Sequence, residues 1–343
     1  MSKKYYIKTF GCQMNVYDSQ RIADILKSMG YEETHTQSAA DMVIFNTCHI
    51  REKAAEKVFS DLGRALLIKN ERKLEGKDTI IGVCGCVVQA EDEQIAVRAP
   101  FVDFATGPLT YHRLPEILAK IERSKGIPVI DTEFPAVAKF DSLPENQAHG
   151  SCAYLAVQEG CDNFCTYCVV PYTRGAEYSR PVEEVISEAK RLVASGCLEI
   201  NLLGQNVNSY AYGFPQLLRD VCRIEKIKRV RFMTSHPKDL SDELIRVISE
   251  EPKIARHIHL PLQSGSSDIL KKMNRKYSKE DYLALAGKIR NTIPDIAITT
   301  DIIVGFPGES EEDFLETMDV VKKVNFDSAF TFIYSRRTGT PAA

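Results

Sequence analysis

Apolar and polar positions follow a repeating strand-then-helix pattern along the first part of the chain. Lys4–Thr9 alternates between the two classes, as half-buried strands do, whereas Asp41–Thr47 and Thr79–Val83 are mostly apolar, which is typical of strands buried on both faces. A further strand is predicted at Phe101–Thr106. Helices are predicted between these runs at Ser19–Met29, Arg51–Asn70 and Leu114–Ile121. Such repeated units predict a parallel sheet with helices on both faces, whose ligands gather beyond the carboxyl ends of the strands.

The pattern stops between Phe134 and Gly150, a stretch with two prolines that is typical of a linker, and we place a domain boundary there. Beyond it the alternation resumes with greater regularity. Strands are predicted at Ala153–Gln158, Glu199–Leu203, Val230–Thr234, His257–Leu262, Ala297–Val304 and Ser328–Tyr334. Two of the intervening helices begin with capping boxes, Ser278–Asp281 and Ser310–Asp313. A closed eight-stranded barrel would need two more units, so the sequence predicts a partial barrel.

Composition and charge limit the cellular compartment and the kinds of chemistry that the sequence predicts. Hydrophobic residues make up 44% of the chain and charged residues 27%, and the net charge of −3 argues against binding nucleic acid through overall charge. No apolar run approaches the ~20 residues that span a bilayer, and the first residues lack a signal peptide, so we expect a cytoplasmic protein. Ten cysteines are many for a reducing compartment, where disulfides are rare. Metal or redox chemistry is therefore expected of some of them.

Three of these cysteines follow the first predicted strand of the second half. Cys161, Cys165 and Cys168 have the spacing C-x3-C-x2-C, and we call them the barrel trio. Three thiolates on one short loop can hold an iron–sulfur cluster and leave one iron without a protein ligand, free to chelate a substrate. A zinc site is the alternative, but it would need a fourth ligand, and Cys152 and His149 precede the strand.

Glycine or polar residues also end the later strands of this half. They are Gly204, Gln205 and Asn206, then Ser235 and His236, then Gln263 and Ser264, and then Gly305. Together with the barrel trio, this arrangement resembles the radical S-adenosylmethionine superfamily, in which the open iron binds the amino and carboxylate groups of S-adenosylmethionine (SAM). The resemblance implies that these residues contact SAM, although Gln205 and Asn206 replace the usual acidic residue. Arg174, soon after the trio, is also expected to touch cofactor or substrate.

A second set of cysteines follows the strands of the first half. Cys12, Cys48, Cys84 and Cys86 each lie at or just past the end of a predicted parallel strand, so they share one edge of the sheet and could hold another cluster. Buried cysteine also occurs simply as a small apolar residue, and this is our expectation for three others. Those three are Cys152, Cys197 and Cys222.

The segments Gly11–Cys12, Asn46–Cys48 and Gly85–Cys86 make the resemblance more specific. They are similar to the motifs of the methylthiotransferases, which join a domain with three ligand cysteines to a radical SAM barrel. The resemblance implies that Cys12, Cys48 and Cys86, the N-terminal trio, hold a second cluster. It also implies an α/β fold. A flavodoxin-like methylthiotransferase domain is expected at residues 1–145 and a radical SAM domain with a partial (β/α)6 TIM barrel at residues 146–343.

The stretches Thr9–Ser19 and Asn46–Arg64 look like the branch of this family that modifies isopentenylated adenosine in transfer RNA. That branch converts N6-isopentenyladenosine beside the anticodon into its 2-methylthio derivative. The resemblance implies two [4Fe–4S] clusters, with SAM as both radical source and methyl donor. One cluster cleaves SAM, and the resulting radical abstracts the C2 hydrogen of adenine. The other cluster holds the sulfur, which a second SAM methylates before it is inserted.

The expected partners are the anticodon loop of transfer RNA and an electron donor such as flavodoxin or ferredoxin, with the enzyme itself a monomer. The family usually continues into a small RNA-binding β-barrel, the TRAM domain, which we expect to be absent here because the sequence stops at Ala343. Basic clusters could contact phosphate or simply be solvated. They are Lys271, Lys272, Arg275 and Lys276, and Arg336 with Arg337. A zinc protein that binds RNA and a sibling methylthiotransferase with another substrate are the competing hypotheses.

Overall fold

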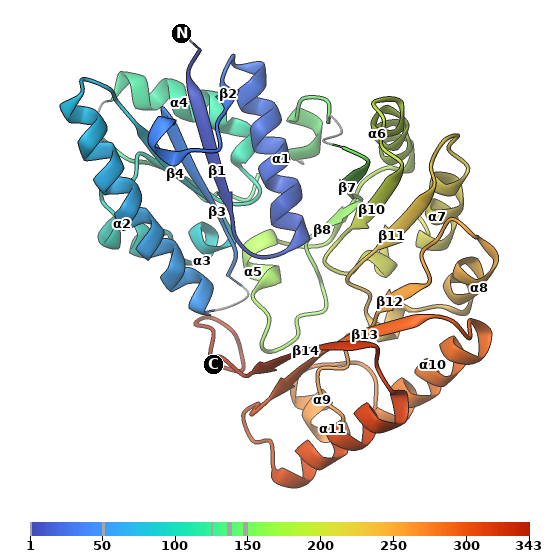
Figure 1. Ribbon diagram of the computed structural model, residues 1–343. Coiled ribbons are helices and arrows are strands. Elements are labelled where there is room, and N and C mark those ends of the chain that lie inside the picture. Colours follow the sequence, from blue (N-terminus) through green and yellow to red (C-terminus); the bar gives the residue numbers. More distant parts are fainter. Residues whose placement is uncertain (1, 50–51, 125, 136–138, 147–149) are drawn as a thin grey trace. The chain divides into compact units, whose positions relative to one another are not determined.

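The computed structural model describes residues 2–49, 52–124, 126–135, 139–146 and 150–343 (Figure 1). The chain forms two compact units. The first comprises Met1–Asn146 and Tyr172–Gly175, and the second comprises Gln147–Pro171 and Ala176–Ala343. The short segment Tyr172–Gly175 therefore packs with the first unit, although the boundary predicted from the sequence places it in the second.

The first unit contains a six-stranded parallel sheet in the order β2-β1-β3-β4-β5-β6. Its strands are β1 (Lys4–Thr9), β2 (Glu32–Glu33), β3 (Met42–Thr47), β4 (Ile80–Gly85), β5 (Phe104–Thr106) and β6 (Val129–Asp131). This order is the flavodoxin-like one, in which the chain reverses its direction of growth between β1 and β3. The predicted fold of the first half is confirmed.

Helices cover both faces of this sheet, and alternating side chains of the strands divide between them. The helices α2 (Glu52–Leu74) and α3 (Cys86–Arg98) pack against Val43 and Phe45 on one face. The helices α1 (Gln13–Ser28) and α4 (Leu114–Arg123) pack against Met42, Ile44 and Phe104 on the other. Because β3 is apolar on both faces, it lies in the middle of the sheet, as its sequence predicts.

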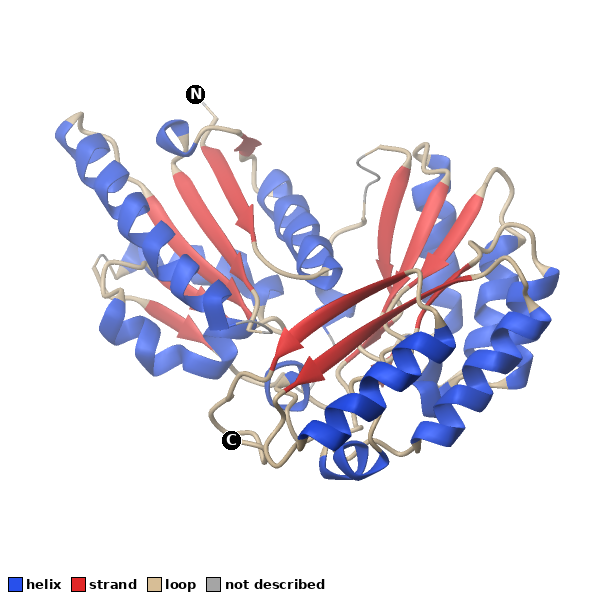
Figure 2. Cartoon of the chain, turned by 60° about the horizontal axis from the view of Figure 1, so that its bottom comes forward, coloured by secondary structure: helices blue, strands red, loops and turns tan. Residues whose placement is uncertain are grey.

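The second unit contains two three-stranded parallel sheets, ordered β11-β10-β7 and β12-β13-β14. Their strands are β7 (Cys152–Ala156), β10 (Glu199–Leu203), β11 (Arg229–Phe232), β12 (His257–His259), β13 (Ala297–Val304) and β14 (Ser328–Ile333). A parallel bridge pairs Val230 of β11 with Ile254, which precedes β12 in the sequence. Figure 2 shows both sheets with helices along their outer side. The six strands of the expected partial barrel are thus present.

The helices of this unit lie between successive strands. They are α5 (Val170–Arg174), α6 (Val182–Ala194), α7 (Phe214–Cys222), α8 (Asp242–Glu250), α9 (Ser267–Lys272), α10 (Lys279–Thr292) and α11 (Glu311–Val324), with α5 ending in the first unit. Both predicted capping boxes form, at Ser278 and Ser310. A short antiparallel pair, β8 (Gln158–Glu159) with β9 (Tyr178–Ser179), flanks the loop that carries the barrel trio.

Two helices of the first unit differ from the sequence prediction. Helix α1 begins at Gln13, six positions before the predicted Ser19. The sequence does not reveal this start, because the first turns bury the polar residues Asn15 and Asp18 and therefore lack apolar periodicity. Helix α3 was not predicted, and Glu91 interrupts its helical backbone. Across the part of the chain that is described, no helix is both long and apolar enough to cross a membrane.

Candidate functional site

The N-terminal trio lies at the carboxyl ends of three neighbouring strands. Cys12 follows β1, Cys48 follows β3 and Cys86 follows β4. Strands β1 and β3 flank the point where the strand order reverses, which is where open α/β sheets bind their ligands. The topology therefore brings together three cysteines that are far apart in the sequence.

Two glycines allow the loops that carry these cysteines to approach closely. A Cβ atom on Gly11 would lie 2.1 Å from the Cβ and 2.6 Å from the Sγ of Cys48, and the φ angle of +102° also disfavours a side chain. A Cβ atom on Gly85 would lie 2.4 Å from the carbonyl oxygen of Thr47. Glycine before Cys12 and before Cys86 is therefore required by the packing of neighbouring strand ends.

Helix termini and hydrogen bonds favour the thiolate form of Cys12 and act in the same direction on Cys86. Cys12 is the N-cap of α1 and Cys86 is the first residue of α3, so both lie at the positive end of a helix dipole. The hydrogen bond with Cys48, followed by the charge of Arg174, lowers the pKa of Cys12 to about 6 against the opposing effect of burial. Burial raises the pKa of Cys86, an effect that the charge and hydrogen bond of Arg174 oppose.

Cys84 differs from the trio in its surroundings. Its side chain belongs to the apolar core between the sheet, α1 and α4. Burial raises the pKa of the Cys84 thiol to about 12, which keeps the thiol protonated. The environment of Cys84 therefore matches that of a small core residue and differs from that of Cys86.

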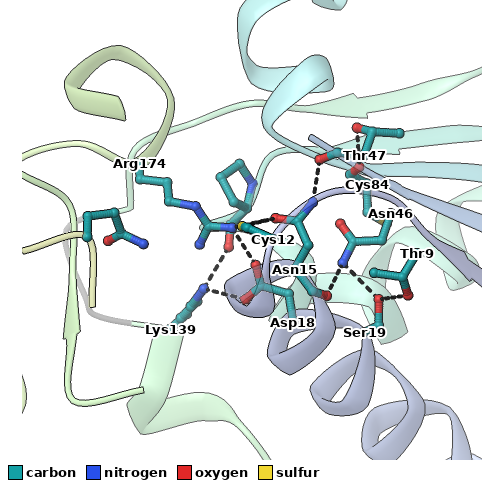
Figure 3. Close-up of polar contacts among 12 residues, drawn as sticks. Thr9, Cys12, Asn15, Asp18, Ser19, Asn46, Thr47, Cys84, Lys139 and Arg174 are labelled. Atoms are coloured by element: carbon teal, nitrogen blue, oxygen red, sulfur yellow. Dashed lines mark hydrogen bonds and ion pairs between the residues drawn. The ribbon is translucent and has the colours of Figure 1, made fainter. Parts of the chain in front are cut away.

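Asn15 on α1 ties the ends of these strands together (Figure 3). Its amide nitrogen donates to the carbonyl oxygens of Phe10 (2.9 Å) and Thr47 (2.8 Å), so it fixes the backbone ahead of Cys12 and Cys48. Its Oδ1 accepts from the Cys12 thiol at 3.7 Å and from Nη2 of Arg174 at 3.1 Å. Sequence analysis missed Asn15, although a polar residue at the buried start of a helix is a usable signal.

The barrel trio lies on the loop between β8 and α5, and each of its sulfurs accepts a hydrogen bond from an N–H group. Asn163 Nδ2 lies 3.3 Å from Cys161 Sγ, Arg275 Nη1 lies 3.6 Å from Cys165 Sγ, and the backbone amide of Val170 lies 3.4 Å from Cys168 Sγ. These donors come from inside the loop, from beyond α9 and from α5. Burial raises the pKa of both Cys161 and Cys168, the latter to about 12.

The turn after α9 holds this loop in place. Asn274 Nδ2 donates to the carbonyl oxygens of Asn163 (3.1 Å) and Phe164 (3.0 Å), and the Thr166 amide donates to Met273 O at 3.1 Å. Phe164 has a positive φ of 46°, a strained conformation that these contacts support. Groups of the protein itself thus hold the cysteine loop.

The sequence predicts Arg275 as a possible phosphate contact together with three neighbouring lysines, and the structure corrects this. Its side chain is buried and donates to Cys165 Sγ, to the Pro261 carbonyl oxygen (3.1 Å) and to the Tyr277 hydroxyl (2.9 Å). Arg337 is also buried. A run of basic residues does not reveal which member turns inward, and here Arg275 does so because the loop sulfur and carbonyl need a donor.

The residues expected to contact SAM lie at the carboxyl ends of successive strands. Gln205 Oε1 accepts the Gly160 amide at 2.6 Å, so this replacement for the usual acidic residue supports the cysteine loop. Asn206 donates to Asp239 Oδ2 at 2.8 Å. Within the described ranges, Asn206 Oδ1 and Ser235 Oγ are buried without a hydrogen-bond partner. Such orphaned polar atoms at two adjacent strand ends fit a polar ligand such as SAM.

The other residues that we expect to contact SAM differ in their surroundings. His236 is buried, and burial, followed by the charges of Arg275 and Lys238, lowers its pKa to about 2. Gln263 has a positive φ of 67° at the point where the backbone pairs with β13, and Gly204 and Gly305 lie where β10 and β13 end. Ser264 is fully buried, with its hydroxyl 3.4 Å from that of Thr317 on α11. Ser264 stays a predicted SAM contact, and its hydroxyl lies beside α11.

Arg174 lies in the first unit, beside the N-terminal trio. Its Nη2 is 2.7 Å from Asp18 Oδ2, and Asp18 Oδ1 is 3.1 Å from Nζ of Lys139. Lys139 belongs to the stretch predicted as a linker, yet it is buried. Sequence analysis missed both Asp18 and Lys139, since a single charged residue in a helix or a loop usually lies at the surface.

The chemistry of the donor sets fits iron–sulfur clusters, because every member of each trio is a cysteine and soft thiolate ligands suit such clusters. Over the described ranges, no three His, Cys, Asp or Glu side chains are arranged to hold one metal ion. A cluster makes a different demand, because each thiolate binds a different iron. All ten cysteines lie within the described ranges and none of them forms a disulfide, so both trios are available as ligands.

Known proteins resemble this chain along its whole length. Residues 155–321 match the family described as the Radical SAM superfamily, and residues 4–107 match Uncharacterized protein family UPF0004. A protein of Maricaulis maris named tRNA-2-methylthio-N(6)-dimethylallyladenosine synthase is 52% identical over 99% of this chain and 77% of its own length. A protein of the same name from Cereibacter sphaeroides is 54% identical over 100% of this chain and 78% of its own length. One from Wolbachia pipientis is 51% identical over 99% of this chain and 78% of its own length.

The chain belongs to the tRNA-2-methylthio-N(6)-dimethylallyladenosine synthase family. The fold of this chain is shared with more distant radical SAM enzymes. The radical SAM methyltransferase TsrM from Kitasatospora setae has a TM-score of 0.72 at 14% identity, covering 100% of this chain and 74% of its own. The cobalamin-dependent radical SAM enzyme OxsB has a TM-score of 0.66 at 13% identity, and the match covers 94% of this chain and 52% of OxsB. These likenesses extend across both units of the chain.

Proposed function

We propose that this chain is a tRNA methylthiotransferase that converts N6-isopentenyladenosine beside the anticodon into 2-methylthio-N6-isopentenyladenosine by radical SAM chemistry. The observation that carries the proposal is the pair of cysteine trios in a chain about half identical to synthases of that name. One trio lies at the carboxyl ends of three parallel strands, and the other lies on the loop that follows β7 and β8. A single radical generator would need only the barrel trio.

We assign a [4Fe–4S] cluster to each trio. When bound, the clusters and SAM supply the electron, the radical and the sulfur that no side chain can provide. Cys161, Cys165 and Cys168 hold the first cluster by three thiolates, leaving one iron open to SAM. Their N–H donors, Asn163, Arg275 and the Val170 amide, favour the thiolate form and orient each sulfur. Cys12, Cys48 and Cys86 hold the second.

We assign the binding of SAM to the strand ends around the barrel trio. Asn206 Oδ1 and Ser235 Oγ are the orphaned acceptor and hydroxyl that a polar ligand would satisfy. His236 accepts the Lys238 amide through Nδ1 at 3.2 Å, which leaves its Nε2 proton available as a donor. The other proposed contacts are Gly204, Gln205, Gln263, Ser264 and Gly305. The chain thereby positions the ligand with neutral groups around one open iron.

The family acts on transfer RNA, and we propose the anticodon loop carrying isopentenyladenosine as this chain's substrate. The base has to leave its stack to reach the cysteine edges, as bases do in other enzymes that modify them. Lys271, Lys272 and Lys276 remain proposed phosphate contacts, since Arg275 turns inward. We further propose a cytoplasmic monomer that takes its electrons from a flavodoxin or ferredoxin.

Cysteine variants of the full chain test the assignment of the two trios. Anaerobically reconstituted protein should hold about eight irons. Cys165→Ala should abolish cleavage of SAM to deoxyadenosine. Cys48→Ala should keep abortive cleavage and lose methylthiolation. Cys222→Ala in the second unit and Cys84→Ala in the first are matched controls, because both thiols lie in apolar cores, and both should retain the product.

The outcomes separate the hypotheses. Loss of SAM cleavage in both trio variants would count against two independent clusters, and a colourless protein containing zinc would refute radical chemistry. The substrate is tested by mass spectrometry of transfer RNA from cells that lack this protein. Persistence of the methylthio mark on isopentenyladenosine in those cells would overturn the assignment and favour a sibling substrate.

A further inference from the structure

A buried ion-pair network lies beside the N-terminal trio, and no step proposed above uses it. Asp18 on α1 is buried and accepts from Arg174 Nη2 at 2.7 Å and from Lys139 Nζ at 3.1 Å (Figure 3). Lys139 also donates to the Pro108 carbonyl oxygen at 2.9 Å. Buried charge is expensive, so such a network is expected to serve a purpose besides stability.

The guanidinium of Arg174 is fixed with respect to two cysteines of the trio. Asn15 Oδ1 accepts from both Arg174 Nη2 (3.1 Å) and the Cys12 thiol (3.7 Å), so the cation and this sulfur meet at one atom. Arg174 also forms a hydrogen bond with the Cys86 side chain. Because arginine is always charged and presents several donors in a rigid fork, it can bond Asp18 and a sulfur at the same time.

The position of Arg174 in the chain is also unusual. It belongs to Tyr172–Gly175, the one segment from beyond Asn146 that packs with the first unit, and it follows the barrel trio closely in sequence. The site of the first unit is therefore completed by a short segment that follows the barrel trio in the sequence.

We propose that Arg174, held by Asp18 and Asn15, is a positioning residue for the second cluster, where its guanidinium donates to the Cys86 sulfur and offsets the negative charge of the ligands. This inference rests on the proposed function, in which the N-terminal trio holds a cluster. Hydrogen bonds and positive charge near cluster sulfurs favour the reduced, more negative state. Arg174 thus raises the reduction potential of the second cluster.

The test uses the full chain with Cys161, Cys165 and Cys168 all replaced by alanine, so that only the second cluster is present. About four irons per chain are expected after anaerobic reconstitution with iron and sulfide. Almost no iron would refute the second cluster itself, and that failure is distinct from the failure of this inference.

The one-electron couple of the remaining cluster is then followed by electron paramagnetic resonance at a fixed solution potential. Arg174→Met should lower the ratio of reduced to oxidised cluster about tenfold, equivalent to about 59 mV. Arg174→Lys, which keeps the charge, should stay closer to the parent. Asp18→Asn, which loosens the guanidinium without removing it, should give an intermediate ratio.

The matched control is Arg21→Met. Arg21 is also a buried arginine of this unit, paired with Asp24 at 2.8 Å, so its loss should lower the melting temperature and leave the ratio unchanged. If Arg174→Met loses its iron while Arg174→Lys keeps it, the requirement for charge at this position is supported. An unchanged ratio in Arg174→Met, or equal effects of Arg174→Met and Arg21→Met on ratio and iron, would overturn the inference.

Discussion

Asp18→Asn is the substitution whose effect on stability the structure predicts most directly. The Asp18 carboxylate is buried and bonds two buried cations, Arg174 at 2.7 Å and Lys139 at 3.1 Å, whose side chains are 3% and 1% exposed. Breaking a buried ion pair by removing one partner costs about 3–5 kcal/mol. Because asparagine keeps one oxygen acceptor, we expect a loss of about 3 kcal/mol. For a unit of this size that loss lowers the melting temperature by about 6–12 °C.

Asp61→Asn is a matched control within the same unit. Asp61 is also buried and also bonds two cations, Lys8 at 2.7 Å and Arg64 at 2.9 Å, but these are 34% and 70% exposed. Water can solvate both cations once the carboxylate charge is gone, so the expected loss is about 1 kcal/mol or less. The difference between the two variants therefore isolates the burial of the cations.

Urea unfolding of the cluster-free protein under reducing conditions measures both losses. Burial would raise the pKa of Asp18, but the charges of Lys139 and Arg174 hold it below its ordinary value of 3.8. A lowered folded pKa contributes stability that is present above the unfolded value and is lost as the pH falls through the folded value. The gap between wild type and Asp18→Asn should therefore be constant above about pH 4 and narrow below it. Equal losses in the two variants, or a gap that widens in acid, would refute the reasoning.

Three further outcomes are expected. Gly11→Ala places a Cβ 2.1 Å from that of Cys48 at a φ of +102°, so we expect a loss of at least about 1–2 kcal/mol and of the second cluster's iron, and full iron content would contradict this. His236, with a pKa lowered to about 2 chiefly by burial, should show no imidazole titration by NMR between pH 5 and 8, and its contribution to stability should decline as the pH falls below about 6.5. Ser310→Ala removes the capping box with Asp313 and should cost about 1 kcal/mol in urea unfolding while leaving the tRNA product unchanged.

The sequence predicts strands well where one physical signal dominates. β3 and β13 are long enough and apolar enough that their bounds agree with the prediction within a residue. Helix α3 was missed because its amphipathic pattern is weak and its backbone is interrupted at Glu91. The start of α1 was missed because its buried face carries Asn15 and Asp18. Polar residues buried to build a site remove the periodicity by which a helix is recognised.

The site residues also differ in whether the sequence alone reveals them. The barrel trio is recognisable from local spacing, because its three ligands share one loop. The partners that orient its sulfurs cannot be recognised in this way, since nothing in the run Lys271–Lys276 distinguishes Arg275 from its neighbours. Asp18, Lys139 and Arg174 come from three distant segments, so their pairing becomes visible only once the chain is folded.

This contrast between local and distributed ligands has a consequence for how the two clusters depend on the fold. The barrel trio shares one loop, which Gln205, Asn274 and Arg275 hold through contacts that lie within the second unit. The N-terminal trio exists only while β1, β3 and β4 stay in register, with Asn15 joining the first two. Damage to the first unit should therefore release the second cluster while the barrel trio keeps its own. A destabilised enzyme would then continue to cleave SAM without inserting sulfur, because the radical generator does not depend on the site that uses the radical.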